Sequence, residues 1–155
     1  ERHGYDPTWE VLSNWEEHKR KEKGQPTDTD ALTAVARSLP ALWRAEKVRK
    51  KAKKAGFDWP DVTGALDKLS EELEELKTAV AEQSNIQEEL GDLLFAAVNV
   101  ARFVHADPEE ALTGASDKFI ARFQKVEALA RAQGRAMKEM TLGELDALWE
   151  RAKQG

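Results

Sequence analysis

Residues 69–104 of the chain read LSEELEELKTAVAEQSNIQEELGDLLFAAVNVARFV. The polar stretch 83–85 interrupts this run, and we expect one helix before it and one after it. On the first helix, apolar residues recur at spacings of three and four, which places them on one face. This apolar stripe consists of Leu66, Leu69, Leu73, Leu76 and Val80. Both helices also carry carboxylates near their apolar residues, namely Glu71, Glu72, Glu75, Glu89 and Asp92.

The carboxylates of the first helix spread over one flank of it. At about 100° per residue, Glu72 lies roughly 70° from the centre of the leucine stripe, and Glu75 lies roughly 130° away. Glu71 falls nearly opposite the stripe. Glu72 is therefore predicted to be closest to the core. The run EELEEL is also typical of a solvated helix, so by itself it does not indicate a functional site.

The second helix carries its carboxylates in a more apolar setting. Between Leu93 and Val104, Asn99 and Arg102 are the only polar side chains, so the helix is predicted to be buried on most sides. Glu89, Asp92 and Asn99 fall on one strip of it. Charged carboxylates that enter a buried helix are costly unless a cation or hydrogen bonds compensate them. Basic partners or a metal ion could do so.

Gly91, beside Asp92, supports a special role for this strip. Glycine inside a helix costs about 1 kcal/mol relative to alanine. It can be tolerated where another group must approach the backbone closely. Several oxygen ligands at helical spacings on two adjacent helices suit a hard divalent cation, with Mg²⁺ expected and Mn²⁺ as a possible substitute. A di-iron carboxylate bundle would need Glu-x-x-His, whereas this chain has Glu89-x-x-Asp92. The spacing therefore favours magnesium and phosphate chemistry over redox chemistry.

The rest of the chain also reads as helices, with no convincing period-two alternation. We predict an all-α fold, an antiparallel helical bundle of four main helices with short flanking helices. The expected helices are residues 8–23, a main helix from about Pro40 to Gly56, one from about Pro60, residues 86–104, a long helix from Pro108 to Gly134, and a short last helix capped by Thr141 and Glu144.

Composition narrows the class of protein. A chain of 155 residues fits one domain with a real core. With no cysteine, disulfides and thiolate zinc sites are excluded, and a reducing cytoplasmic location is expected. A formal charge of −5 argues against dedicated nucleic-acid binding, and no apolar run reaches the ~18 residues of a membrane span. Because the chain begins at Glu1 without a methionine, we expect an excised or trimmed domain.

A basic face is expected on the helix that follows Pro40. Arg44, Lys47, Lys51 and Lys54 recur at spacings of three and four. One interpretation is a solvated surface, which is what charge runs usually form. The other interpretation is a docking surface for phosphates.

The carboxylate pattern resembles a known family. The sequences EELEE and EELGD resemble the E-E-x-x-E … E-x-x-D signature of the all-α nucleoside triphosphate pyrophosphohydrolases. More narrowly, the chain resembles the MazG family, and specifically its C-terminal domain. The sequences that carry this resemblance are LPALWRAEKVRKKAKKAGFDWPDV, EELGDLLFAAVNVARF, DPEEAL and KFIARFQKVE. The similarity runs from about Trp9, in a segment like the MazG inter-domain linker, to Trp149.

The resemblance implies an antiparallel bundle that forms a homodimer and hydrolyses NTP or dNTP substrates to the monophosphate and pyrophosphate, as in housecleaning of nucleotide pools. It implies Mg²⁺ bound by Glu72, Glu75, Glu89 and Asp92, with Glu71, Glu72 and Glu75 as the catalytic residues. It further implies substrate contacts from Lys118, Arg122, Asn99, Trp149, Arg44, Lys47 and Lys51. Residues 1–30 would then be a linker-like helix with a mobile segment, and residues 31–155 the catalytic domain.

Two alternatives remain at this point. A non-catalytic helical scaffold, oligomerisation or regulatory domain could keep the same bundle, although the complete set of carboxylates argues against it. A dUTPase-like or phosphoribosyl-ATP pyrophosphohydrolase specificity could also use the bundle, but the flanking sequences fit MazG better.

Overall fold

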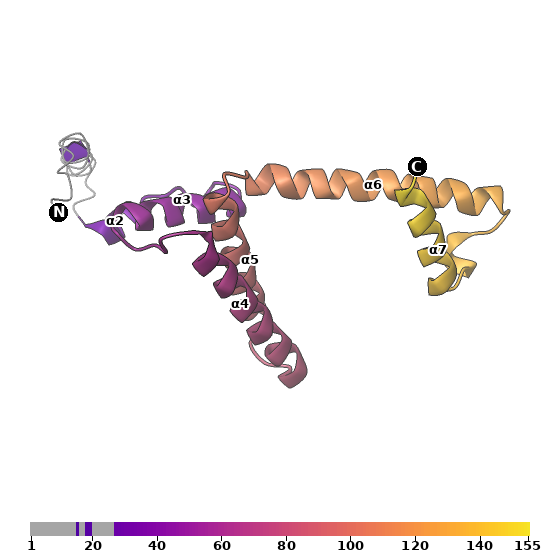
Figure 1. Cartoon of the computed structure of the whole chain (residues 1–155), viewed down its shortest axis with the longest axis horizontal. Coiled ribbons are helices and arrows are strands. Elements are labelled where there is room, and N and C mark those ends of the chain that lie inside the picture. The colour runs from indigo at the N-terminus through magenta and orange to yellow at the C-terminus, as the bar shows by residue number, and fades with distance from the viewer. Residues whose placement is uncertain (1–14, 16–17, 20–26) are drawn as a thin grey trace, which may run out of the picture. The chain divides into compact units, whose positions relative to one another are not determined.

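Every regular element in the described part of the chain is a helix. The computed structural model describes residues 15, 18–19 and 27–155. Its elements are α2 (Asp28–Thr33), α3 (Ala41–Lys54), α4 (Val62–Glu82), α5 (Ile86–Phe103), α6 (Pro108–Ala132), the 3₁₀ helix η1 (Met137–Glu139) and α7 (Leu142–Lys153) (Figure 1). The predicted all-α class is confirmed over these residues. The predicted helix 8–23 falls largely outside the described residues.

The observed helix ends lie close to the predicted ones. Helix α3 starts after Pro40, which cannot donate a backbone hydrogen bond and is therefore tolerated at a helix start. Helix α4 begins at Val62, two residues later than predicted, because the side chain of Asp61 caps it by accepting a 2.8 Å hydrogen bond from the Thr63 amide. None of the described helices is long and apolar enough to cross a membrane.

Helices α4 and α5 form a hairpin that places the acidic stretches side by side. The turn between them has Gln83 and Asn85 in left-handed conformations, which ends one helix and starts the next within three residues. Helix α4 buries Ala65, Glu72 and Ala79, which follow each other at a spacing of seven. Because two of these three side chains are small, α5 can approach α4 closely along this line. Glu72 lies in the middle of it, as predicted.

The predicted leucine stripe is not the buried face of α4. Leu66, Leu73 and Val80 are 42–55% exposed in the single chain. The buried line of α4 is Ala65, Glu72 and Ala79. The prediction that this stripe packs inward is therefore wrong for the isolated chain.

The predicted burial of α5 on most sides is likewise wrong for the isolated chain. The helix buries a narrow face containing Ala96, Val98, Asn99 and Arg102. Apolar side chains on its other faces remain exposed, including Leu90, Leu94, Phe95 and Val104. Apolar composition alone cannot tell a helix buried within a chain from one covered by a partner.

The segment between α3 and α4 is tied to both α3 and α5 through one carboxylate. Oδ1 of Asp58 accepts a 3.3 Å hydrogen bond from Arg49 of α3 and a 2.6 Å hydrogen bond from Arg102 of α5. A second tie joins the start of α3 to the residue before α6, where Nε1 of Trp43 donates to Asp107 at 2.8 Å. These contacts hold α3 against the α4–α5 hairpin.

Trp59 packs against the first turn of α4 at a glycine. A Cβ placed on Gly64 would lie 2.4 Å from Cδ1 of Trp59, which no alanine can accommodate without moving the ring. We expect Gly64→Ala to lower the free energy of unfolding by about 1–3 kcal/mol, the usual cost of overpacking. Gly91→Ala is the matched control, because a Cβ there has nothing within 4 Å. Urea unfolding of both variants should show destabilisation at Gly64 alone, and equal stability of the two would contradict this packing.

Residues from Glu109 onward form a second compact unit. Its small core consists of Val126, Ala130, Met140, Leu148 and Ala152. The predicted capping box of α7 is present, with Thr141 and Glu144 bonded to each other's backbone amides. Gly134 follows α6 at a φ of +66°, the conformation expected of a residue that ends a helix.

Candidate functional site

Carboxylates of α4 and α5 converge as the sequence predicts. Glu72 and Glu75 come from α4 and Glu89 comes from α5, and one oxygen from each lies within 4.8 Å of the others. Glu72 is only 6% exposed. Asp92, the fourth predicted ligand, lies outside this group, although it lines the adjoining cavity together with Glu71 and Glu72.

The chemistry of this cluster fits a divalent cation. Oε2 of Glu72 and Oε2 of Glu89 are buried and have no hydrogen-bond partner among the described residues. Burying a carboxylate oxygen without a partner is costly, and a hard cation with oxygen ligands would remove that cost for both atoms. A hydrogen bond with Glu72, together with its negative charge, raises the pKa of Glu75 above its ordinary value. The cluster therefore has an excess of negative charge in a partly buried place.

Lys68 is a member of the site that the sequence interpretation missed. Its Nζ lies 3.1 Å from Oε1 of Glu72 and 3.4 Å from Oε1 of Glu71. Hydrogen bonding to Glu72 raises the pKa of Lys68 and keeps it charged. Lys68 therefore pairs with Oε1 of Glu72, whereas Oε2 of Glu72 is the buried oxygen that has no hydrogen-bond partner among the described residues. The spacing of four residues between Lys68 and Glu72 could have revealed this pair.

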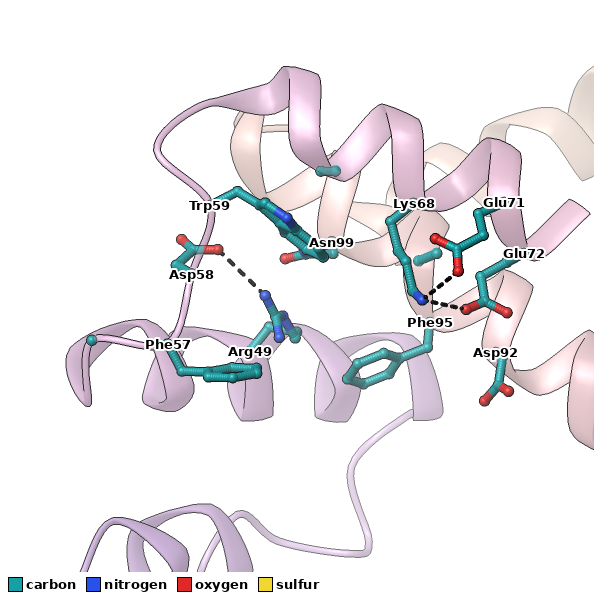
Figure 2. Close-up of a pocket in the computed structure, with 13 residues that line it drawn as sticks. Arg49, Phe57, Asp58, Trp59, Lys68, Glu71, Glu72, Asp92, Phe95 and Asn99 are labelled. Carbon is teal, nitrogen blue, oxygen red and sulfur yellow. Dashed lines mark hydrogen bonds and ion pairs between the residues drawn. The ribbon is translucent and has the colours of Figure 1, made fainter.

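A cavity of about 740 Å³ extends from these carboxylates. Figure 2 shows Glu71, Glu72 and Asp92 at one end and the 57–59 segment at the other, with Lys68 and Phe95 between them. The residues that line it are Arg49, Gly56, Phe57, Asp58, Trp59, Ala65, Lys68, Glu71, Glu72, Asp92, Phe95, Ala96 and Asn99. One end of the cavity is thus acidic, and the other end is aromatic.

A buried hydrogen-bond network forms the wall at the aromatic end. Arg102 donates through Nε to Oδ1 of Asn99 at 2.9 Å and through Nη2 to Asp58 at 2.6 Å. Burial opposes ionisation of Asp58, but the hydrogen bond and charge of Arg102 outweigh it and lower the pKa of Asp58. Arg49 shares the same carboxylate. The sequence predicted Asn99 here but missed Arg49, Asp58 and Arg102, of which Arg102 stood out as a cation in an apolar helix.

The predicted basic residues of α3 lie at other cavities. Arg44 lines a cavity between α3 and α5, together with Gly91 and Phe95. Lys47 and Lys51 line a cavity between α2 and α3. In the described part of the chain, Arg49 is the α3 cation that lines the cavity next to the carboxylates. The substrate contacts predicted for Arg44, Lys47 and Lys51 stay predictions.

Lys118, Arg122 and Trp149 belong to the C-terminal unit. Lys118 and Arg122 lie on α6 four residues apart, as expected, and Trp149 lies on α7. The guanidinium carbon of Arg122 is 5.9 Å from the centre of the Trp149 ring, and Phe119 packs on the same ring at 5.2 Å. Trp149 thus has a packing role within this unit, and substrate contacts of all three predicted residues stay predictions.

The raised pKa of Glu75 predicts how metal binding depends on pH. In the metal-free protein the folded state favours the protonated carboxyl, so this contribution to stability is present at low pH and is lost as pH rises through the raised pKa. A metal ion needs the deprotonated form, so Mg²⁺ affinity should increase over the same range with release of a proton. Calorimetric Mg²⁺ titrations in buffers of different ionisation enthalpy measure that proton. A pH-independent affinity without proton release would contradict this expectation.

Comparison with known proteins finds similarity over the residues of this site. Residues 60–127 match the MazG nucleotide pyrophosphohydrolase domain. Over 149 residues, 94% of this chain, the sequence is 40% identical to a nucleoside triphosphate pyrophosphohydrolase of Escherichia coli (strain K12), covering 57% of that protein. Over 141 residues, 91% of this chain, it is 41% identical to the nucleoside triphosphate pyrophosphohydrolase/pyrophosphatase MazG of Thermotoga maritima, covering 54% of it.

A third relative is longer still. The chain is 45% identical over 148 residues to an uncharacterized protein, YabN, of Bacillus subtilis, and covers 30% of it. The chain thus spans little more than half the length of the first two relatives and less than a third of this one. The matched segment 60–127 contains all five predicted carboxylates as well as Lys118 and Arg122. By these matches the chain is similar to proteins of the MazG family, and residues 60–127 match the MazG nucleotide pyrophosphohydrolase domain.

Proposed function

We propose that this chain is a Mg²⁺-dependent nucleoside triphosphate pyrophosphohydrolase, which converts NTP or dNTP to the monophosphate and pyrophosphate in housecleaning of nucleotide pools. The observation that carries the proposal is the convergence of Glu72, Glu75 and Glu89. Glu72 and Glu89 each have a buried oxygen with no hydrogen-bond partner among the described residues, and Glu72 also lines one end of a cavity of about 740 Å³. The names of the relatives from Escherichia coli and Thermotoga maritima support it.

Four carboxylates would hold the cation, namely Glu72, Glu75, Glu89 and Asp92. When bound, Mg²⁺, or Mn²⁺ in its place, supplies positive charge for phosphate oxygens and makes water a better nucleophile. Glu71 or Glu75 accepts the proton of the attacking water.

Basic side chains would bind the phosphate chain. Lys68 already lies beside Glu71 and Glu72, so it can meet a phosphate oxygen next to the cation. Lys118 and Arg122 share one face of α6, and they stabilise the charge of the leaving pyrophosphate. Further substrate contacts are proposed for Trp149, Arg44, Lys47 and Lys51.

A homodimer is part of the proposal. The apolar side chains that α4 and α5 leave exposed include Leu66, Leu73, Val80, Leu90 and Leu94. Exposed apolar side chains in such number along two packed helices are typical of a protein interface. A second copy of the chain would cover them. Sedimentation equilibrium should therefore give twice the mass of the chain, and a monomer at micromolar concentration would contradict a dimer.

Pyrophosphate release from a panel of NTPs and dNTPs tests the activity. We expect release with Mg²⁺ or Mn²⁺, none with excess chelator, and pyrophosphate rather than orthophosphate as the product. Calorimetric titration with a non-hydrolysable nucleotide and Mg²⁺ addresses the scaffold alternative. Neither pyrophosphate release nor any heat of binding would support the scaffold and contradict the enzyme.

A further inference from the structure

The cavity has a second end, whose chemistry differs from that of the carboxylates. Phe57 and Trp59 line it, and both belong to the segment between α3 and α4 (Figure 2). Phe57 is 72% exposed, so its ring is available at the cavity rather than used in a core. Trp59 is held in place by Gly64, against which its ring packs. A fixed aromatic ring and an exposed one therefore stand at the same end.

The guanidinium group of Arg49 lies close to both rings. Its guanidinium carbon lies 5.9 Å from the centre of the Phe57 ring and 5.5 Å from the centre of the Trp59 ring. Asp58 fixes this guanidinium group with a 3.3 Å hydrogen bond. Aromatic rings and guanidinium planes are the surfaces on which nucleobases stack in proteins.

Asn99 contributes a polar side chain at the same end, and its hydrogen bond with Arg102 fixes the orientation of its amide group. Its side chain is almost fully buried, at 2% exposure, and lines the cavity. Arginine can only donate hydrogen bonds, so the Asn99 atom that faces Nε of Arg102 must be the carbonyl oxygen. The amide nitrogen of Asn99 can therefore donate to a ligand, while its carbonyl oxygen is already held by Arg102.

We propose that this aromatic end of the cavity, formed by Arg49, Phe57, Trp59 and Asn99, is the nucleobase subsite. The proposal rests on the proposed function, because the acidic end then takes the phosphates of the same nucleotide. The base packs on the Phe57, Arg49 and Trp59 surface, and an acceptor atom on its edge, a carbonyl oxygen or a ring nitrogen, receives a hydrogen bond from Asn99. Stacking provides affinity for any base, and Asn99 provides the preference among bases.

Equilibrium binding of the four ribonucleoside monophosphates to the full chain tests this subsite without turnover. The variants are Phe57→Ala and Asn99→Asp, and Asn99→Asp still accepts from Arg102 but can no longer donate to a base. Val104→Ala is the matched control, because this residue is exposed and does not line the cavity. Mn²⁺ binding without nucleotide is measured in each variant to show that the carboxylates are intact.

We expect Phe57→Ala to weaken binding of all four monophosphates about tenfold, because stacking does not depend on the identity of the base. Asn99→Asp should change the order of preference among the four. Mn²⁺ binding should stay at the parental value in both variants, and Val104→Ala should bind every monophosphate like the parent. Monophosphate affinities within about twofold of the parent in both variants would overturn the subsite.

The outcome also separates this proposal from the enzyme activity. If the parental chain releases pyrophosphate while both variants bind monophosphates normally, the subsite is wrong and the activity stands. If the parental chain releases none but its monophosphate binding depends on Phe57 and Asn99, the subsite stands and the activity is wrong. A parental chain that binds none of the four monophosphates overturns the subsite.

Discussion

Replacing Glu72 by glutamine should reduce pyrophosphate release by at least about 100-fold, because a proposed metal ligand is a carboxylate whose negative charge an amide cannot supply. Among the described residues, Glu72 is the most buried acidic residue, and its Oε2 has no hydrogen-bond partner there. Glutamine keeps the size and the ability to accept from Lys68, so the fold should be retained. Initial rates of pyrophosphate release, with circular dichroism to follow helicity, measure this change.

Glu74→Gln is the control for that substitution. Glu74 lies two residues away on the same helix, but its exposed side chain pairs with Lys77 at 2.9 Å and does not line the cavity. Its activity should equal that of the parent. If Glu72→Gln stayed as active as Glu74→Gln, Glu72 would have no part in hydrolysis.

Replacing Asp58 by alanine should destabilise the compact unit that precedes Glu109. The free energy of unfolding of this unit should fall by about 3–5 kcal/mol, as expected when one partner of a buried ion pair is removed. The side chains of Arg49 and Arg102 are 10% and 5% exposed, and Asp58 is their shared acceptor. Without it, two buried guanidinium groups would lack a compensating charge. Because the pKa of Asp58 is lowered, its contribution is present above the ordinary aspartate pKa and is lost as pH falls through the lowered value.

Hydrogen exchange of the α5 amides, followed by mass spectrometry at increasing urea, reports on this unit separately from the C-terminal one. Glu74→Ala removes an exposed ion pair from the same unit and should cost no more than about 1 kcal/mol. Equal protection of α5 in the two variants would show that Asp58 is not the tie between α3 and α5.

Local sequence patterns were sufficient for the helices α3 to α7, whereas the short helix α2 (Asp28–Thr33) was not predicted. Caps and breakers act over a few residues, so Pro40, Asp61 and the pair Thr141–Glu144 mark helix starts regardless of the tertiary fold. Glu72 is buried as expected, but that expectation rested on the leucine stripe, which is not the buried face of α4. The convergence of Glu72, Glu75 and Glu89 followed from a short turn between two acidic helices.

Packing that depends on distant residues was not predictable in the same way. The leucine stripe of α4 suggested an internal core, but the chain buries the line Ala65, Glu72 and Ala79 instead. Small residues carry little hydrophobic signal, although they allow two helices to approach most closely. The Asp58–Arg102 pair joins residues 44 apart in sequence, and periodicity carries no information about such pairs.

The structure also changes which carboxylate is the strongest candidate for the site. The apolar composition of α5 gave most weight to Glu89 and Asp92, on the premise that this helix is buried on most sides. In the single chain Glu89 is half-buried and Asp92 is exposed, whereas Glu72 of the apparently ordinary EELEEL run is buried. Glu72 is therefore the residue on which a test of the site should centre.

The most direct measurement is pyrophosphate release from nucleoside triphosphates by the parental chain and by Glu72→Gln, each with Mg²⁺ and with excess chelator. We predict pyrophosphate from the parental chain with Mg²⁺ alone, and loss of that release in Glu72→Gln and with chelator. Chelator-insensitive release, or equal release by the two proteins, would contradict a metal-dependent site built on the carboxylates of α4 and α5.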